Sequence, residues 1–244
     1  MPSLLNSHYS MITKKEKKIL AVLSGAGISA ESGLGTFRDS GGLWENYRIE
    51  DVATPEAWQA NPELVLEFYN MRRKINNEAK PNQAHHILAD LEQYFEIHIV
   101  TQNIDDLHER AGSSQVLHLH GEITKSKSSG PNQEKEYFDI ADNDIHVGDL
   151  CPDGYQLRPH VVWFGEEVPM LDNAAEIIAK ANIFLVIGTS LNVYPAAGLI
   201  HAVSNNCVCY AIDPKDIPIS SRFKHIRADA GAGMQRFADL VRNM

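Results

Sequence analysis

Short runs of consecutive apolar residues recur along the chain, separated by longer and more polar stretches. Most of the runs are rich in Ile, Val and Leu and end at Gly, Asn or Asp, which is typical of strands buried on both faces of a parallel sheet. The pattern predicts strands at residues 19–24, 97–103, 116–121, 160–165, 183–191 and 207–213.

The stretches between these runs carry helix signals. Asn61, Pro62 and Glu63 are a helix cap, a first-turn proline and a first-turn acid, which predicts a helix from here to about residue 74. Further helices are expected near Ala30 and over residues 83–93, 171–181, 195–204 and 232–242. Strands that alternate with helices predict an α/β fold, a Rossmann-like open and mostly parallel sheet with helices on both faces.

Two segments, residues 36–78 and 122–158, fit this alternation poorly, and the second is polar and contains the breaker SSGP at residues 128–131. We expect the two to form a small domain together. The Rossmann-like part would then comprise residues 18–35, 79–121 and 159–244.

Composition narrows the function classes. The chain has 244 residues, of which 43% are hydrophobic and 22% charged, as in ordinary globular proteins. A net charge of −10 disfavours a nucleic-acid partner, and the short run from Lys14 to Lys18 fits a solvated edge. No apolar run approaches the roughly 18 residues of a membrane helix, and the N-terminus does not resemble a secretory signal. Three cysteines, Cys151, Cys207 and Cys209, predict no disulfide framework, so we expect a cytoplasmic protein without a membrane partner.

A glycine turn follows the first predicted strand. Residues 25–30 (GAGISA) satisfy the pattern G-x-G-x-x-G/A, in which glycines let the backbone approach a pyrophosphate at a helix N-terminus. An ordinary turn explains the same residues equally well. The acid that binds the ribose in ordinary dehydrogenases, about 20 residues further on, is missing, so a dinucleotide would have to bind in an unusual way.

Polar residues follow two other predicted strands. Gln102, Asn103 and Asp105 lie where open α/β sheets bind ligands, although Asn103 or Asp105 would serve equally as a cap for the next helix. His118 and His120 share one face of the strand at residues 116–121. His120, at the strand end, is a candidate general base, whereas we expect a structural role for His118.

Together, GAGISAESG with TFRD, TQNID, HLHG, RPHVVWFGE (158–166) and GTSL (188–191) resemble the sirtuin family, in the family's order and spacing, over about residues 18–240. The resemblance implies one sirtuin-type domain over residues 1–244 that removes acyl groups from protein lysines and consumes NAD. It implies cofactor binding by Gly25, Ala26, Gly27, Ser29, Ala30, Thr36, Phe37, Arg38, Trp44, Gln102, Asn103, Ile104, Asp105, Gly188, Thr189, Ser190, Asp213 and Ala230. It implies peptide binding by Val161, Trp163, Phe164, Gly165 and Glu166.

The resemblance also implies the chemistry. Asn103 and Asp105 would hold the ribose of NAD against the acyl-lysine amide oxygen, where orientation alone is worth about 7–11 kcal/mol. His120 would act as the catalytic base on a ribose hydroxyl, a step worth about 10²–10⁴-fold. The products would be deacylated lysine, nicotinamide and O-acyl-ADP-ribose.

Tyr69 and Arg72 are three residues apart and share one face of the predicted helix. By composition alone, Arg72 fits the solvated end of an amphipathic helix. Residues 53–73 resemble, however, the sirtuin subgroup in which a Tyr-x-x-Arg pair binds the distal carboxylate of succinyl- or malonyl-lysine. A fixed guanidinium fork and a phenol hydroxyl suit that carboxylate. We therefore predict a desuccinylase or demalonylase with some deacetylase activity.

The family pattern breaks between residues 121 and 157. Sirtuins carry two Cys-x-x-Cys pairs here that bind structural zinc, but this interval contains only Cys151. Ser128, Pro131 and Gly154 stand at the other ligand positions, and the spacing of the neighbouring His146, Asp149 and Asp153 supports no replacement site. We expect no zinc, with Tyr137, Phe138 and Tyr155 packing in its place. Two smaller departures from the family pattern are Gly35, where many relatives have Pro or Arg, and Asp213, where Asn is common.

Two other functions stay open on this fold. A mono-ADP-ribosyltransferase or NAD glycohydrolase would break the same bond and pass ADP-ribose to a protein or to water. A non-catalytic sensor would bind NAD or acyl-lysine without turnover. The expected partners are acyl-lysine side chains of proteins, and we expect a monomer.

Overall fold

The computed structural model describes residues 16–35, 47–140, 143–242 and 244. Its larger part is a six-stranded sheet in the order β3-β2-β1-β7-β8-β9, in which neighbouring strands are parallel. The strands are β1 (Ile19–Ser24), β2 (Glu96–Thr101), β3 (Val116–His118), β7 (Ile183–Ile187), β8 (Val208–Ile212) and β9 (Phe223–Ile226). The predicted Rossmann-like parallel sheet is confirmed.

The strand order reverses beside β1, because β2 and β3 lie on one side of it and β7 lies on the other. Ser24 at the end of β1 is in register with Thr101 of β2 and Ile187 of β7, so the three strands end at the same edge. In open α/β sheets, ligands bind beyond the carboxyl ends of strands at such a reversal. The fold therefore places the candidate site just past these three residues.

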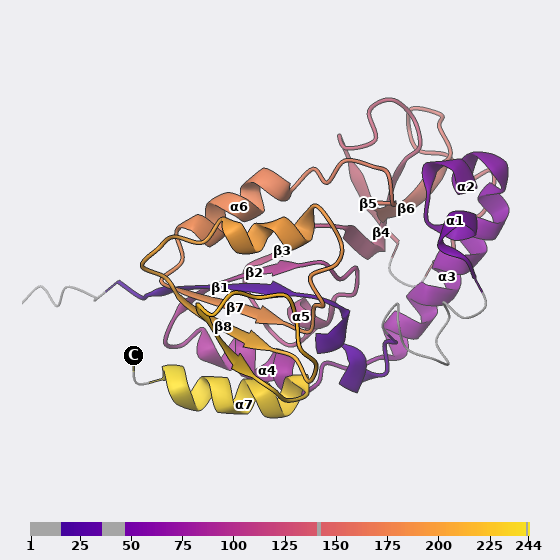
Figure 1. Cartoon of the computed structure of the whole chain (residues 1–244). Coiled ribbons are helices and arrows are strands. Elements are labelled where there is room, and N and C mark those ends of the chain that lie inside the picture. Colours follow the sequence, from indigo (N-terminus) through magenta and orange to yellow (C-terminus); the bar gives the residue numbers. More distant parts are fainter. Residues whose placement is uncertain (1–15, 36–46, 141–142, 243) are drawn as a thin grey trace, which may run out of the picture.

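Helices cover both faces of the sheet (Figure 1). On one face lie α4 (Gln83–Leu91) and α7 (Ala230–Val241), and on the other lie α6 (Leu171–Ala179) and the 3-10 helix η4 (Ala196–His201). Leu20 and Val22 of β1 belong to the first hydrophobic core, and Ala21 and Leu23 to the second. Because both faces are covered, the central strands are continuous apolar runs and do not alternate with polar residues.

A small antiparallel sheet in the order β5-β4-β6 lies beside α1, α2 and α3 at one end of the molecule (Figure 1). Its strands are β4 (Gly121–Ser128), β5 (Tyr137–Asp139) and β6 (Leu157–Val161), and the helices are α1 (Ile49–Val52), α2 (Pro55–Ala60) and α3 (Pro62–Glu78). Asn61 caps α3 by accepting a hydrogen bond from the Leu64 amide at 3.1 Å. The buried Arg73 of α3 donates to the Ile123 carbonyl of β4 at 2.9 Å, which ties the helix to the sheet.

Several elements differ from their predicted extent. The helix expected near Ala30 consists of two 3-10 turns, η1 (Ala26–Ile28) and η2 (Ala30–Ser32), and the one expected at 195–204 is η4. The strands expected at 160–165 and 183–191 end before Gly165 and Gly188, whose positive φ angles of 94° and 61° turn the chain. Several short elements were not predicted, namely the strands β4, β5 and β9 and the helices α1, α2 and α5 (Leu107–Arg110). Among the described residues, no helix has the length and apolarity needed to cross a membrane.

Candidate active site

The glycine turn after β1 packs directly against the end of β7. The amides of Gly25 and Gly27 donate to the carbonyls of Ile187 and Gly188 at 3.1 and 2.8 Å. A Cβ on Gly27 would lie 2.8 Å from the Gly188 Cα, and a Cβ on Gly188 would lie 2.3 Å from the Ile28 nitrogen. These glycines are thus required for contact between two chain segments at the sheet reversal, in addition to any approach of a pyrophosphate.

A buried hydrogen-bonded group lies just beyond the strand ends. Ser29 Oγ donates to Asp105 Oδ2 at 3.0 Å and accepts from Asn103 Nδ2 at 3.1 Å. Asp105 Oδ1 also accepts from the Leu107 amide at 3.2 Å, beside the start of α5. Burial raises the pKa of Asp105, and the hydrogen bonds from Ser29 and Leu107 oppose that rise. Asp105 thus serves the local turn and also belongs to the polar group that faces the reversal.

Gln102 joins this group to β7. Its Nε2 donates to Thr189 Oγ1 at 3.1 Å, while Thr189 Oγ1 also accepts from the Leu191 amide at 3.3 Å. Three sequence motifs, around residues 25–30, 101–105 and 188–191, therefore meet at one place. Such a set of hydroxyl, amide and carboxyl groups at the carboxyl edge of a parallel sheet fits a polar ligand such as a dinucleotide.

His120 lies between β3 and β4, and its ring contacts the backbone of Gln102, a member of this group. Its Nδ1 is 2.9 Å from the Gln102 carbonyl oxygen, which can only accept, so the proton of the neutral ring is on Nδ1. No described residue is hydrogen-bonded to Nε2, which in this tautomer carries a lone pair. Burial lowers the pKa of His120, and the bond to Gln102 partly opposes that effect. A neutral imidazole with Nε2 available is suited to act as a general base.

Tyr69 and Arg72 lie together on α3, as the helical spacing predicts. Tyr69 is 1% exposed, and the Arg72 guanidinium carbon lies 5.8 Å from the centroid of its ring and 5.7 Å from that of Phe68. Burial raises the pKa of Tyr69 against the pull of Arg72, so its hydroxyl is a neutral donor at neutral pH. Burial lowers the pKa of Arg72, and attraction to Tyr69 and Asp105 opposes this. The arginine is half-buried between aromatic rings rather than at a solvated helix end.

The turn after β6 is fixed by a buried ion pair. Arg158 donates to Glu166 through Nη1 at 2.7 Å and Nη2 at 3.1 Å, and Glu166 Oε2 also accepts from the Trp163 amide at 2.7 Å. The Phe164 amide donates to the Ala53 carbonyl at 3.0 Å, and the Phe164 side chain is 42% exposed. Glu166 thus faces its own turn, while Phe164 and Gly165 lie at the surface.

A sequence model of the Sir2 family matches residues 25–195, which is more than half of the chain. The chain belongs to the Sir2 family.

Similar Sir2 proteins cover almost the whole chain. A protein of Bacteroides thetaiotaomicron named NAD-dependent protein deacylase is 51% identical over 230 residues, which span 92% of this chain and 98% of that protein. A Helicobacter pylori (strain J99) protein of the same name is 52% identical over 199 residues, 81% of this chain and 83% of its own length. Among solved structures, a Sir2 homolog–NAD complex has a TM-score of 0.82 and 39% identity and covers 93% of this chain and 91% of its own. A mutant Sir2 homologue bound to ADP-ribose has a TM-score of 0.84 at 38% identity, with 93% of both chains covered.

The other residues that the Sir2 resemblance predicts for the cofactor are spread around the same edge. Asp213 follows β8, where its Oδ1 accepts from the Lys215 amide at 2.8 Å, and the buried Ala230 is the first residue of α7. Ile104 is held by its carbonyl, which accepts from the Ile123 amide at 2.8 Å. Four predicted residues, Thr36, Phe37, Arg38 and Trp44, lie outside the described residues.

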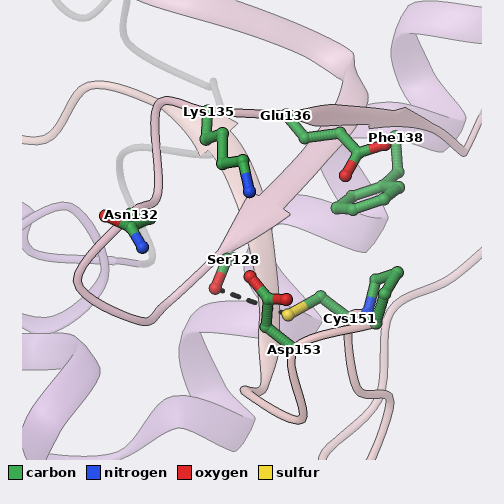
Figure 2. A pocket seen from close by; sticks show the side chains of 8 residues that line it. Ser128, Asn132, Lys135, Glu136, Phe138, Cys151 and Asp153 are labelled. Atoms are coloured by element: carbon green, nitrogen blue, oxygen red, sulfur yellow. Dashed lines mark hydrogen bonds between the residues drawn. The ribbon is translucent and has the colours of Figure 1, made fainter.

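The residues at the zinc-ligand positions implied by the sequence resemblance are a poor donor set for zinc in this chain. Cys151 Sγ donates to Ser128 Oγ at 3.5 Å, so two of the expected ligand positions do lie together, but only one of them is a thiol (Figure 2). The pocket beside them is lined by Ser128, Asn132, Lys135, Glu136, Phe138, Cys151, Pro152 and Asp153. In the described part of the chain, no three His, Cys, Asp or Glu side chains are arranged to bind a metal. These residues do not fit a structural zinc ion.

Sequence reasoning missed three charged residues that organise the site. Arg158 and Glu31 stand inside the quoted motifs without being singled out, and Glu109 lies on α5, just after TQNID. Glu31 accepts from the Gly231 amide at the start of α7 at 2.7 Å. Glu109 Oε1 lies 2.8 Å from His118 Nε2. The available signal was a charged residue within an otherwise apolar or ligand-binding motif, which in a folded protein requires a partner.

Proposed function

We propose that this Sir2 enzyme removes succinyl and malonyl groups from protein lysines, and acetyl groups as well, in a reaction that consumes NAD. The enzyme is an NAD-dependent protein deacylase, the activity for which its full-length relatives are named. The acyl preference is the proposal, and the observation that carries it is the position of Arg72 beside the hydroxyl-bearing Tyr69 and near Asp105.

The polar group at the strand ends would bind the nicotinamide side of NAD. When bound, NAD supplies the ADP-ribosyl group that takes up the acyl group, and nicotinamide is released. Ser29, Asn103 and Asp105 are already joined by hydrogen bonds of 3.0 and 3.1 Å, so they would hold the ribose without first reorganising. Such preorganisation is how orientation contributes to the rate.

His120 would take a proton from a ribose hydroxyl through Nε2. The Gln102 carbonyl keeps the other ring proton on Nδ1, and burial keeps the pKa of the ring below its ordinary value, so the base is neutral and ready at physiological pH. Gln102 is itself tied to Thr189. The base is thus aligned by the same loop that carries Asn103 and Asp105.

The acyl chain would lie between α3 and the Asp105 loop. Of the two adjacent arginines on α3, Arg73 is buried and bonded within the fold through Nε and Nη1 to Ile123, Asn70 and Asn143. Arg72 instead lies over aromatic rings, where a planar guanidinium stacks well and presents its N–H groups at the edge. A guanidinium and a phenol hydroxyl side by side on one helix match a distal carboxylate better than they match a methyl group.

Kinetics with succinyl- and acetyl-lysine peptides test the acyl preference. Arg72→Met should lower kcat/KM for the succinyl peptide by about 10- to 100-fold, the value of a hydrogen bond to a charged group, and change the acetyl value far less. Lys74→Met, at an exposed site on the same helix, is the matched control. An unchanged succinyl value in Arg72→Met contradicts the assignment. Mass spectrometry of the products distinguishes O-acyl-ADP-ribose from free or protein-bound ADP-ribose.

We also propose that the small sheet is stable without zinc. Tyr137 stacks on His160 at 3.9 Å and donates to Glu134 at 2.7 Å, and the Tyr155 ring packs so closely on Gly130 that a Cβ there would lie 2.6 Å from it. Elemental analysis of the purified enzyme should find no stoichiometric metal, and a zinc content near one per chain contradicts the proposal. A cytoplasmic monomer remains our proposal, and all three cysteines are unpaired thiols, as a reducing compartment favours.

A further inference from the structure

Two histidines of the HLHG motif hold two successive carbonyls of the loop that carries Asn103 and Asp105. His120 Nδ1 lies 2.9 Å from the Gln102 oxygen, and His118 Nδ1 lies 2.9 Å from the Asn103 oxygen. Both carbonyls follow the end of β2, where the ladder to β3 stops at Thr101 and His118. The two side chains thus extend the pairing of the strands by one residue each into the catalytic loop.

The outer nitrogens of the two rings differ. His120 Nε2 carries no proton when its ring is neutral, but His118 Nε2 lies 2.8 Å from Glu109 Oε1 of α5. Both ring nitrogens of His118 therefore face oxygens that only accept. A neutral imidazole has one N–H and satisfies one such oxygen, whereas an imidazolium satisfies both. The His118 side chain is 7% exposed, so bulk water could not replace a hydrogen bond that the ring failed to make.

We propose that His118 is a positioning residue which, as an imidazolium clamped by Glu109, fixes the Asn103 carbonyl and thereby the orientation of the Asn103–Asp105 loop. If the ring lost a proton, the remaining one would stay on Nε2, because the bond to the carboxylate is charge-assisted. The Asn103 carbonyl would then lose its donor. The inference rests on the proposed roles of Asn103 and Asp105 in binding NAD.

The charges around His118 support this state. Burial disfavours the charged ring, but Glu109, the Asn103 carbonyl and Glu122 of β4 outweigh it and raise the pKa of His118. The cation in turn opposes the rise in the pKa of Asp105. The other titratable groups that interact with it are His108 of α5 and His160 of β6, and burial lowers the pKa of both rings, so they add no competing positive charge.

Imidazole NMR of the cofactor-free enzyme tests the charge state directly. The ring signals, assigned by their loss in His118→Asn, should show two N–H protons at neutral pH. Glu109→Gln should lower the His118 titration midpoint by about one unit or more, the effect of removing an adjacent opposite charge. Glu96→Gln, which breaks the surface pair of Glu96 with His98 at 3.0 Å, is the matched control and should leave His118 unchanged. A singly protonated His118 at neutral pH, or a midpoint that Glu109→Gln does not move, overturns the inference.

Kinetics test the positioning role. His118→Phe should lower kcat by about tenfold or more while KM for the acyl peptide stays within about twofold, because His118 is not among the residues predicted to bind the peptide. His118→Asn places an amide donor near the Nδ1 position and should restore most of kcat. A wild-type kcat in His118→Phe, or no recovery in His118→Asn, overturns the inference; if His118→Phe does not fold, the NMR comparison decides. Activity that survives in His120→Ala would instead contradict the proposed function, so the two failures are distinguishable.

Discussion

Arg158 and Glu166 form a two-pronged ion pair, with Nη1 to Oε1 at 2.7 Å and Nη2 to Oε2 at 3.1 Å. The guanidinium carbon also lies 3.3 Å from the centroid of the Trp163 ring, and the carboxylate accepts from the Trp163 amide. The pair therefore fixes both the backbone and the ring of Trp163, in the turn that the sequence resemblance predicts to bind the substrate peptide.

Removing one member of this pair should cost more than removing both. Arg158→Met leaves the Glu166 carboxylate with 16% exposure and without its cation, so we expect a loss of about 3–5 kcal/mol in the free energy of unfolding. The double variant Arg158→Met with Glu166→Gln should recover part of that loss. Urea unfolding of the single and double variants measures this coupling, and strictly additive losses would contradict it.

Gly27 should not accept even a methyl group. Its Cβ would lie 2.8 Å from the Gly188 Cα, so Gly27→Ala must push the glycine turn away from β7. We expect a loss of about 1–3 kcal/mol in stability and a smaller thermal shift on adding NAD. Gly198→Ala, where a Cβ meets nothing within 4 Å, is the control and should unfold like the wild type. Thermal unfolding with and without NAD measures both effects, and equal behaviour of the two variants contradicts the expectation.

The sequence predicts the buried part of the fold well, because there the physical signal is local. The central strands β1, β7 and β8 are buried apart from the first residues of β1 and β8, and their continuous apolar runs reveal them. The edge strand β9 is only partly buried and contains Lys224 and His225, so it carries no such run. The 3-10 turns after β1 are set by contact with Gly188, a residue far away in the sequence, and local propensity cannot show that.

The sequence also predicts only part of the candidate site, namely its residues but not the contacts between them. The motifs identify Ser29, Asn103 and Asp105 as candidates, but their mutual hydrogen bonds join residues 74 and 76 positions apart. Whether Asp105 caps a helix or joins a polar group could not be decided from sequence; the N-cap of α5 is Asp106, and Asp105 accepts from both the Leu107 amide and Ser29. The partners of His118 could not be foreseen either, because Glu109 reaches it only once α5 packs beside β3.

Stability should fall as the pH falls below about 6.5, the ordinary value for histidine. His85 and His108 are buried with ring centroids 4.9 Å apart, and burial lowers the pKa of His85 to about 4. The unfolded chain takes up a proton at His85 between these two values and the folded chain does not. Stability is thus fully present above pH 6.5 and is lost toward pH 4, by up to about 1.4 kcal/mol per pH unit for this one residue.

Replacing His85 tests that slope. His85→Gln preserves the capping box, since Gln is a usual residue at that helix position and accepts from the Asn82 amide as His85 does. Urea unfolding at pH 5, 6 and 7 gives the free energy of unfolding as a function of pH. In this variant its slope should be smaller by about one proton. His201→Gln, at the exposed end of η4, should keep the wild-type slope. The same slope in His85→Gln and the wild type would show that His85 is not protected from protons.

The pair of Lys127 and Glu134 should respond asymmetrically to mutation. Lys127 on β4 is 2% exposed, its Nζ lies 2.5 Å from Glu134 Oε1, and the Glu134 side chain is 38% exposed. Removing the carboxylate strands a buried ammonium, whereas removing the ammonium leaves a carboxylate that water can reach. Glu134→Gln should therefore cost about 3–5 kcal/mol, and Lys127→Met clearly less.

Urea unfolding of these two variants measures how much this ion pair contributes to the stability of the small sheet. Lys125→Met is the matched control, because Lys125 lies on the same strand and pairs with Glu122 at 2.9 Å, but is 32% exposed and should cost at most about 1 kcal/mol. If Lys127→Met costs as much as Glu134→Gln, the buried charge is not the source of the asymmetry. If neither exceeds Lys125→Met, this pair does not stabilise β4. A large loss confined to Glu134→Gln instead means that the ion pair restrains the 128–136 loop by compensating the buried ammonium of Lys127.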